Sequence, residues 1–198
     1  MKHKIIFDVF GVLFSSGFAS SAEQLCEHLD RPQKEVEPVY ERWEIPFDLG
    51  SVSEKRFWEL VQKDLGTNID WEILNNVVKN RYNQIEGSIN LLKKYSNLTE
   101  CYLLSNTRKE WFEYLDSIYK ITKHVKYSFL SYEMKLLKPN IEIFWKVLRK
   151  IGIDPQYIIF IDDSIENIRT AMLTGMQTHH FNDALKTERF IKNVIRVS

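Results

Sequence analysis

The chain has 198 residues, and its 27 Lys and Arg side chains equal its 27 Asp and Glu side chains, so the formal net charge is zero. A chain of this length can bury a substantial apolar centre, either in one domain or in a core with an insertion. Because no basic excess would attract nucleic acid or an acidic membrane surface, the composition disfavours partners of both kinds.

Neither targeting signals nor cysteine pairing is expected. Cys26 and Cys101 are too far apart for a metal-binding spacing and are typical of free thiols in a reducing compartment. No apolar run approaches the roughly 18 residues of a membrane span, and Asp8 interrupts the N-terminal run, unlike in a signal peptide. We therefore expect a cytoplasmic protein that has no membrane partner, and we make no prediction about its oligomeric state.

Four short apolar runs have the length of strands, and each is followed by a turn signal and a helix-length pattern. They cover residues 4–7, 101–104, 157–161 and 177–181. Such alternation predicts an α/β fold with a parallel sheet covered by helices. Pro139 and Gly152 bracket a further helix, and Gly175 marks a helix end.

Residues 8–100 separate the first two runs, although a complete βαβ unit needs only roughly 30 residues. The intervening sequence has helical signals: a Ser at the start of 21–29, Ser53 and Gly66 around an apolar stripe, and Asp70 before the pattern of 71–85. We predict a catalytic core formed by residues 1–14 and 85–198, with a small helical cap, residues 15–84, inserted after the first strand.

Polar side chains follow the predicted strands. Asp8, Ser105, Lys138 and the pair Asp162–Asp163 should meet at one edge, because the carboxyl ends of parallel strands lie together and bind ligands there. A carboxylate nucleophile, a hydroxyl and a cation for phosphate oxygens, and carboxylates for Mg²⁺ suit phosphoryl transfer. Each residue alone has an ordinary structural explanation: Asp8 could cap a turn, Ser105 a helix, Lys138 could be a solvated side chain, and Asp162–Asp163 could be acids in the first turn of a helix. The ordered set therefore carries the interpretation.

This ordered set resembles the haloacid dehalogenase-like hydrolase superfamily over essentially the whole chain. Its four motifs look like "FDVFGVL", "LLSNT", "LLKPNIEIF" and "IFIDDSIENI". The DD-x-x-x-N form of the last motif is similar to that of small sugar-phosphate phosphatases and of the phosphatase domain of soluble epoxide hydrolases. The resemblance implies a Rossmann-like core with an inserted helical cap and a Mg²⁺-dependent phosphatase acting on a small phosphorylated substrate.

Carried over to this sequence, the resemblance makes Asp8 the nucleophile that forms an aspartyl-phosphate, and Lys138 its charge-neutralising partner. Ser105 and Lys138 would bind the phosphate, and backbone N–H groups near Gly11 and at Asn106 could serve its other oxygens. Asp8, Asp163 and the backbone carbonyl of Phe10 would hold Mg²⁺. Asp162 and Asn167 would support that site.

Phe10 departs from the pattern, because most phosphatases of this superfamily carry an acid two residues after the nucleophile. That acid protonates the leaving oxygen and then activates water, neither of which a phenyl ring can do. General acid–base catalysis contributes roughly 10²–10⁴-fold, so its loss favours acyl, aryl or anomeric sugar phosphates, or a proton donor elsewhere. Candidate donors in the predicted cap are Glu41, Glu44, Asp48 and His28.

Two other functions fit parts of the sequence. Haloacid dehalogenases also place an aromatic residue at this position, but they need no metal and lack the paired acids Asp162 and Asp163. A catalytically weak protein that binds a phosphorylated ligand or a protein partner is the third possibility. Magnesium dependence separates the first two functions, and measurable turnover separates both from the third.

Overall fold

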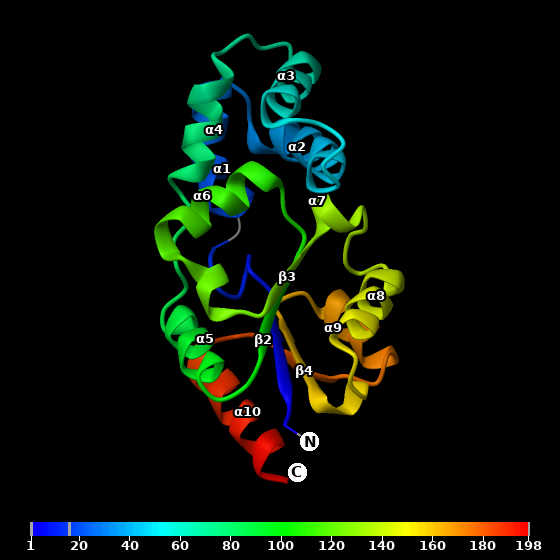
Figure 1. The fold of residues 1–198 in the computed structure, drawn as a ribbon. Coiled ribbons are helices and arrows are strands. Elements are labelled where there is room, and N and C mark those ends of the chain that lie inside the picture. Colours follow the sequence, from blue (N-terminus) through cyan, green and yellow to red (C-terminus); the bar gives the residue numbers. More distant parts are fainter. Residues whose placement is uncertain (1, 16, 198) are drawn as a thin grey trace.

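A parallel sheet of five strands forms the centre of the computed structural model, which describes residues 2–15 and 17–197 (Figure 1). The strand order is β3-β2-β1-β4-β5. The strands are β1 Lys4–Phe7, β2 Cys101–Ser105, β3 Tyr127–Leu130, β4 Ile158–Asp162 and β5 Gln177–His180. The predicted α/β fold is confirmed, and four strands lie within one residue of the predicted runs. β3 was not predicted, because this edge strand has only two buried residues, Phe129 and Leu130.

Both faces of the sheet are buried at its three central strands, β1, β2 and β4, which explains why these strands are almost continuously apolar. Successive residues of β1 alternate between the faces: Ile5 and Phe7 pack into one apolar cluster, and Ile6 packs into another. Ile6 lies opposite Tyr102 of β2 and Phe160 of β4, which belong to the same cluster. β1 is therefore the central strand of the sheet and contributes to both cores.

Helices cover the two faces. α5 (Ser88–Ser96), α6 (Lys109–Tyr119) and α10 (Ala184–Val197) contribute to the cluster that contains Ile5, and α8 (Ile141–Ile151) and α9 (Ile165–Leu173) contribute to the one that contains Ile6. The remaining elements of this region are α7 (Ser131–Met134) and the 3₁₀ turns η1 (Ile121–His124) and η2 (Pro155–Tyr157). The end of α8 at Gly152, whose φ is +72°, agrees with the prediction.

Four helices lie between β1 and α5: α1 (Gly17–Leu29), α2 (Gln33–Asp48), α3 (Glu54–Leu65) and α4 (Trp71–Lys79). The expected signals hold for α3, where Ser53 accepts a hydrogen bond from the backbone N–H of Arg56 and Gly66 ends the helix with a φ of +66°. Asp70 likewise caps α4. Two predictions were wrong in detail: α1 begins before Ser21, and α4 ends at Lys79 rather than continuing to residue 85.

α2 was not predicted, because Pro38 and Pro46 stand inside it and proline normally interrupts a helix. Its buried residues Val36, Tyr40 and Phe47 nevertheless pack with the apolar cluster that contains Ile5. Tertiary packing therefore outweighs the local preference against a helix. The last two turns of α2 carry Glu44 and Asp48, two of the candidate proton donors.

The chain leaves the sheet region and returns to it at one place. The backbone N–H of Ser15 donates to the carbonyl of Asn83, and that of Ile85 donates to the carbonyl of Leu13, each at 2.9 Å. Figure 1 shows α2 and α3 at the end of the molecule opposite both termini, beyond the carboxyl end of β1. The domain boundaries at residues 15 and 84 stay a prediction. None of the helices in the described residues is long and apolar enough to cross a membrane.

Candidate active site

Asp8 directly follows the central strand β1 and is 6% exposed. Its backbone N–H donates to the carbonyl of Ile161 on β4 at 2.9 Å, which continues the sheet pairing up to this residue. Its Oδ1 accepts a hydrogen bond of 2.7 Å from the backbone N–H of Val9. The strand and its neighbour thus hold the carboxylate at the edge of the sheet, with Oδ2 left for other partners.

Lys138 provides that partner. Its Nζ lies 2.8 Å from Oδ2 of Asp8 and 2.6 Å from Oδ2 of Asp162, and the lysine side chain is 1% exposed. The loop that carries it is held by two hydrogen bonds with the side chain of Asn106: Asn106 Nδ2 donates to the carbonyl of Lys138 at 2.9 Å, and the backbone N–H of Lys138 donates to Asn106 Oδ1 at 2.8 Å. Lys138 and Asn106, 32 residues apart in sequence, are therefore positioned together.

Asp162, at the end of β4, is fully buried and bonded on both oxygens. Oδ1 accepts from the backbone N–H of Ser164 at 2.8 Å and from Asn167 Nδ2 at 2.9 Å, while Oδ2 accepts from Lys138. Because its oxygens are already occupied, Asp162 is suited to orienting Lys138 and Asn167. This arrangement agrees with a supporting position for Asp162 and Asn167 beside Asp8.

The cluster around Asp8 contains more acidic groups than basic groups. Burial raises the pKa of Asp8, and nearby Asp162 and Asp163 add to this effect, although Lys138 opposes it. Burial alone would lower the pKa of Lys138, but the carboxylates of Asp8 and Asp162 outweigh it and raise that pKa, so the ammonium stays protonated. Three carboxyl groups therefore face one ammonium, a combination that a bound cation would stabilise.

Asp163 completes a candidate metal centre. Carboxylate oxygens of Asp8, Asp162 and Asp163 all lie within 4.8 Å of one another. Gly11 makes room for this cluster: it has a φ of +82°, and a Cβ atom at this position would lie 2.0 Å from Oδ2 of Asp163. Oxygen-rich sites of this kind fit hard cations such as Mg²⁺.

Gly11→Ala is predicted to destabilise the protein by more than its backbone conformation alone would explain. A positive φ costs a non-glycine residue about 1–2 kcal/mol, and overpacking against Asp163 adds about 1–3 kcal/mol. Gly66→Ala is the matched control, because Gly66 also has a positive φ but a Cβ atom added there would have no neighbour within 4 Å. Urea denaturation of both variants measures the difference. Equal losses of unfolding free energy in Gly11→Ala and Gly66→Ala would show that the Asp163 side chain can move away from the new Cβ atom at no cost.

The other predicted phosphate-binding residue, Ser105, lies at the end of β2 and is completely buried. Its hydroxyl is 3.3 Å from the carbonyl oxygen of Asn106. Unlike Asn106 and Gly11, it is not among the residues that line the cavity beside Asp8. The structure thus brings Asp8, Gly11, Asn106, Lys138, Asp163 and Asn167 to one cavity.

The cavity has a volume of about 530 Å³, and the inserted helices contribute to its wall. Glu44 and Asp48 of α2 line it together with Arg108, which immediately precedes α6. Arg108 donates to Asp48 at 2.5 Å and to Glu44 at 2.7 Å, and its guanidinium carbon lies 3.9 Å from the ring centre of Trp111. Phe10 and Tyr82 form a further part of the wall, with ring centres 5.1 Å apart.

Sequence reasoning missed Arg108 and Tyr82 as cavity residues. Arg108 belongs to the motif "SNTRKEW", which looks like an ordinary polar helix start, and its burial depends on partners 60 and 64 residues away. Of the four candidate proton donors, only Glu44 and Asp48 line the cavity. Glu41 is exposed, and Nδ1 of His28 bonds to the carbonyl of Gln24 within α1.

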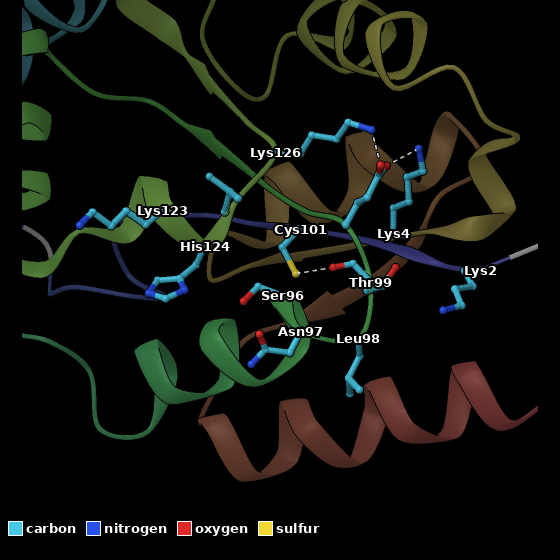
Figure 2. Close-up of a pocket in the computed structure, with 12 residues that line it drawn as sticks. Lys2, Lys4, Ser96, Asn97, Leu98, Thr99, Cys101, Lys123, His124 and Lys126 are labelled. Atoms are coloured by element: carbon cyan, nitrogen blue, oxygen red, sulfur yellow. Dashed lines mark hydrogen bonds and ion pairs between the residues drawn. The ribbon is translucent and has the colours of Figure 1, made fainter.

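A second hollow lies at the opposite edge of the sheet, where β1 and β2 begin (Figure 2). It is basic, but Glu100 pairs with Lys4 at 2.7 Å and with Lys126. Cys101 borders this hollow; burial raises the pKa of its thiol to about 12, and both cysteines are free, as expected. Lys4 and Lys126 both pair with the carboxylate of Glu100, and the raised pKa keeps the Cys101 thiol protonated. The described residues that line this hollow therefore offer no nucleophile comparable to Asp8.

Comparison with known proteins agrees with this geometry. A family model described as haloacid dehalogenase-like hydrolase matches residues 4–180. The chain belongs to this family. Among curated proteins, this hydrolase is similar to flavin mononucleotide hydrolase 1 of Arabidopsis thaliana, with 26% identity over 141 residues, or 71% of this chain. The match spans 57% of that protein's length.

Solved structures show the same fold. A HAD family enzyme of Bacteroides thetaiotaomicron superposes with a TM-score of 0.82 at 22% identity, covering 91% of this chain and 94% of the other. That enzyme has also been solved in complex with magnesium and inorganic phosphate. The L-2-haloacid dehalogenase of Xanthobacter autotrophicus superposes with a TM-score of 0.65 at 17% identity, covering 90% of this chain and 76% of the other.

Proposed function

We propose that this hydrolase is a magnesium-dependent phosphatase that acts on a small phosphorylated metabolite through an aspartyl-phosphate intermediate, with sugar phosphates as candidate substrates. The observation that carries the proposal is the buried carboxylate of Asp8, 2.8 Å from Nζ of Lys138 and grouped with two further carboxyl groups at the wall of a cavity. The arrangement supplies a nucleophile, a cation and a candidate metal site within one small volume.

In the proposed reaction, a carboxylate oxygen of Asp8 attacks the phosphorus atom and the bond to the leaving oxygen breaks. Water then hydrolyses the aspartyl-phosphate and regenerates Asp8. Both reactants are negatively charged, so positive charge must be in place before they can approach. Lys138 supplies part of it, and its two hydrogen bonds with Asn106 keep it in position.

Asp8, Asp163 and the backbone carbonyl of Phe10 are the proposed ligands of Mg²⁺, with Asp162 and Asn167 in support. The donor set fits the ion, because carboxylate and carbonyl oxygens are its preferred protein ligands. When bound, Mg²⁺ neutralises charge on the carboxylates and on the transferred phosphate. The magnesium and inorganic phosphate complex of the Bacteroides enzyme supports Mg²⁺ as the ion.

The phosphate oxygens are proposed to be held by Ser105, Asn106 and the turn at Gly11. Asn106 and Gly11 already line the cavity, and backbone N–H groups in such turns bind anions. We further propose that residues 15–84 form a cap over the core, because Glu44 and Asp48 of α2 reach the wall of the same cavity. Specificity for the leaving group would then depend on these inserted helices.

Dehalogenation is the alternative that a specific observation favours, since Phe10 places an aromatic ring beside the nucleophile and a dehalogenase shares the fold. Against it stand the three carboxyl groups grouped at the site, which would repel a haloacid anion unless a metal neutralised them. Phosphatase chemistry explains both the carboxyl cluster and Lys138, so it is the better-supported function.

The deciding experiment is phosphate release from aryl, acyl and sugar phosphates and from flavin mononucleotide, with and without Mg²⁺. Magnesium-dependent release that is lost on chelation is the expected result. Halide release from 2-haloacids without metal would favour dehalogenation instead. If neither product appears, the third function, binding of a phosphorylated ligand or protein without turnover, becomes the best explanation, and calorimetry with inorganic phosphate and Mg²⁺ would test it.

A further inference from the structure

Breaking a phosphate ester leaves a negatively charged oxygen that needs a proton, and the proposed phosphatase function, on which this inference rests, therefore requires a proton donor. Phe10 occupies the cavity wall where it packs against Tyr82, and a phenyl ring has no proton to give. Outside the Asp8 cluster, the carboxyl groups that line the cavity are Glu44 and Asp48 of α2 and Glu166 of α9. Glu166 is exposed, and hydrogen bonds from a backbone N–H and from Ser164 lower its pKa, so Glu44 and Asp48 are the better candidates.

α2 places these two carboxyl groups at the cavity wall. Glu44 and Asp48 lie one helical turn apart, so both side chains emerge on one face of α2. They share the guanidinium of Arg108, which stacks on Trp111 and also approaches Phe47, with its carbon 5.2 Å from the ring centre. The hydroxyl of Tyr40 lies 3.3 Å from the same guanidinium.

This arrangement fixes Asp48 more firmly than Glu44. The Asp48 side chain is 11% exposed, whereas that of Glu44 is 33% exposed. The backbone carbonyl of Asp48 also accepts a hydrogen bond of 2.6 Å from the hydroxyl of Ser131, which ties the end of α2 to the sheet region. A rigidly held, buried carboxyl group is the better placed of the two to act on a bound substrate.

The protonation of Asp48 is compatible with proton donation near neutral pH. Burial raises its pKa to about 7, with Arg108 opposing the shift and Glu44 adding to it. One guanidinium faces two carboxyl groups, so the pair can retain one proton. Tyr40 and Tyr82, which also surround Arg108, stay neutral because burial raises the pKa of both phenols.

We propose that Asp48 is the general acid and base of this hydrolase, taking the place of the acid that Phe10 lacks. As the bond between phosphorus and the leaving oxygen breaks, that oxygen takes the proton from the Asp48 carboxyl group, and the new carboxylate stays paired with Arg108. Asp48 then removes a proton from the water that attacks the aspartyl-phosphate. Asp48 is thereby protonated again, Asp8 is released as a carboxylate and phosphate leaves.

The test compares Asp48→Asn with the wild type in the first turnover only, before the aspartyl-phosphate is hydrolysed, as release of glycerol from glycerol phosphate, whose leaving group needs a proton, and of nitrophenol from nitrophenyl phosphate, whose leaving group needs none. Asp48→Asn should slow the first substrate roughly 10²–10⁴-fold and the second less than about tenfold. The wild-type rate with glycerol phosphate should fall as pH rises above neutrality, and the variant should lose this decline. Glu41→Gln, on the exposed side of α2, is the control and should change neither rate.

A purely structural role of Asp48 as the partner of Arg108 predicts equal losses for both substrates, and that result would overturn the proposal. So would a leaving-group-dependent loss in Glu44→Gln but not in Asp48→Asn. If Asp48→Asn does not fold, NMR titration of aspartate carboxyl carbons in the wild-type protein decides instead: Asp48 should titrate with a pKa of about 7, and titration with a pKa in the ordinary aspartate range refutes the assignment. A wild type without phosphate release from these two esters and from the acyl phosphates, sugar phosphates and flavin mononucleotide would refute the proposed function itself, and this inference with it.

Discussion

Asp8→Asn should abolish phosphate release. The amide has nearly the same shape as the carboxylate but cannot attack phosphorus, and removal of a covalent nucleophile costs other enzymes on the order of 10⁶-fold in rate. Steady-state phosphate release and acid-quench trapping of a phosphorylated protein both measure the effect. The wild type should form the phosphorylated species with Mg²⁺, and the variant should form none.

The fold should survive this substitution. Asp8→Asn removes one of three crowded carboxyl groups, while Lys138 keeps its contact of 2.6 Å with Asp162. Urea denaturation should therefore show no loss of unfolding free energy. Asp183→Asn is a useful comparison, because Asp183 is a partly exposed acid outside the cavity beside Asp8 and should leave the rate unchanged. A variant at Asp8 that keeps the wild-type rate would exclude the aspartyl-phosphate mechanism.

Phe10→Asp should raise the rate with alkyl phosphates and have little effect with aryl phosphates. The new carboxyl group would stand two residues after the nucleophile and on the wall of the same cavity, so it could protonate the leaving oxygen. In the Asp48→Asn background the gain should approach the roughly 10²–10⁴-fold worth of general acid catalysis. In the wild type it should be smaller, because Asp48 already supplies a proton.

The control is Phe10→Asn, which removes the same packing against Tyr82 but offers no acidic proton. Rates for alkyl and aryl phosphates, measured for both variants in the wild-type and Asp48→Asn backgrounds, separate the proton from the packing change. Equal gains for Phe10→Asp and Phe10→Asn would mean that relief of crowding, and not proton transfer, accounts for the effect. If Phe10→Asp does not raise the rate with alkyl phosphates in either background, the result would count against the view that protonation of the leaving oxygen limits this rate.

Much of the fold is encoded in short stretches of sequence. The runs that form β1, β2 and β4 are recognisable because a strand buried on both faces must be apolar at nearly every residue. Ser53, Gly66, Asp70 and Gly152 mark helix ends because capping is a local interaction within a few residues. β3 and α2 escaped prediction because a half-exposed edge strand and a helix with two prolines lack these signals.

The residues of the candidate site likewise fall into two groups, those that the sequence predicts and those that only the tertiary structure brings together. Asp8 and Asp163 were predictable because each follows a recognisable strand, and the carboxyl ends of parallel strands lie together, so position along the chain implies position in space. Lys138 follows β3, which was not predicted, so its position depended on the resemblance to the family. Nothing local indicates that Arg108 is buried, or that Glu44 and Asp48 share it while Glu41 stays exposed. Those contacts join α2 to the loop before α6, and they arise only when the inserted helices pack against the core.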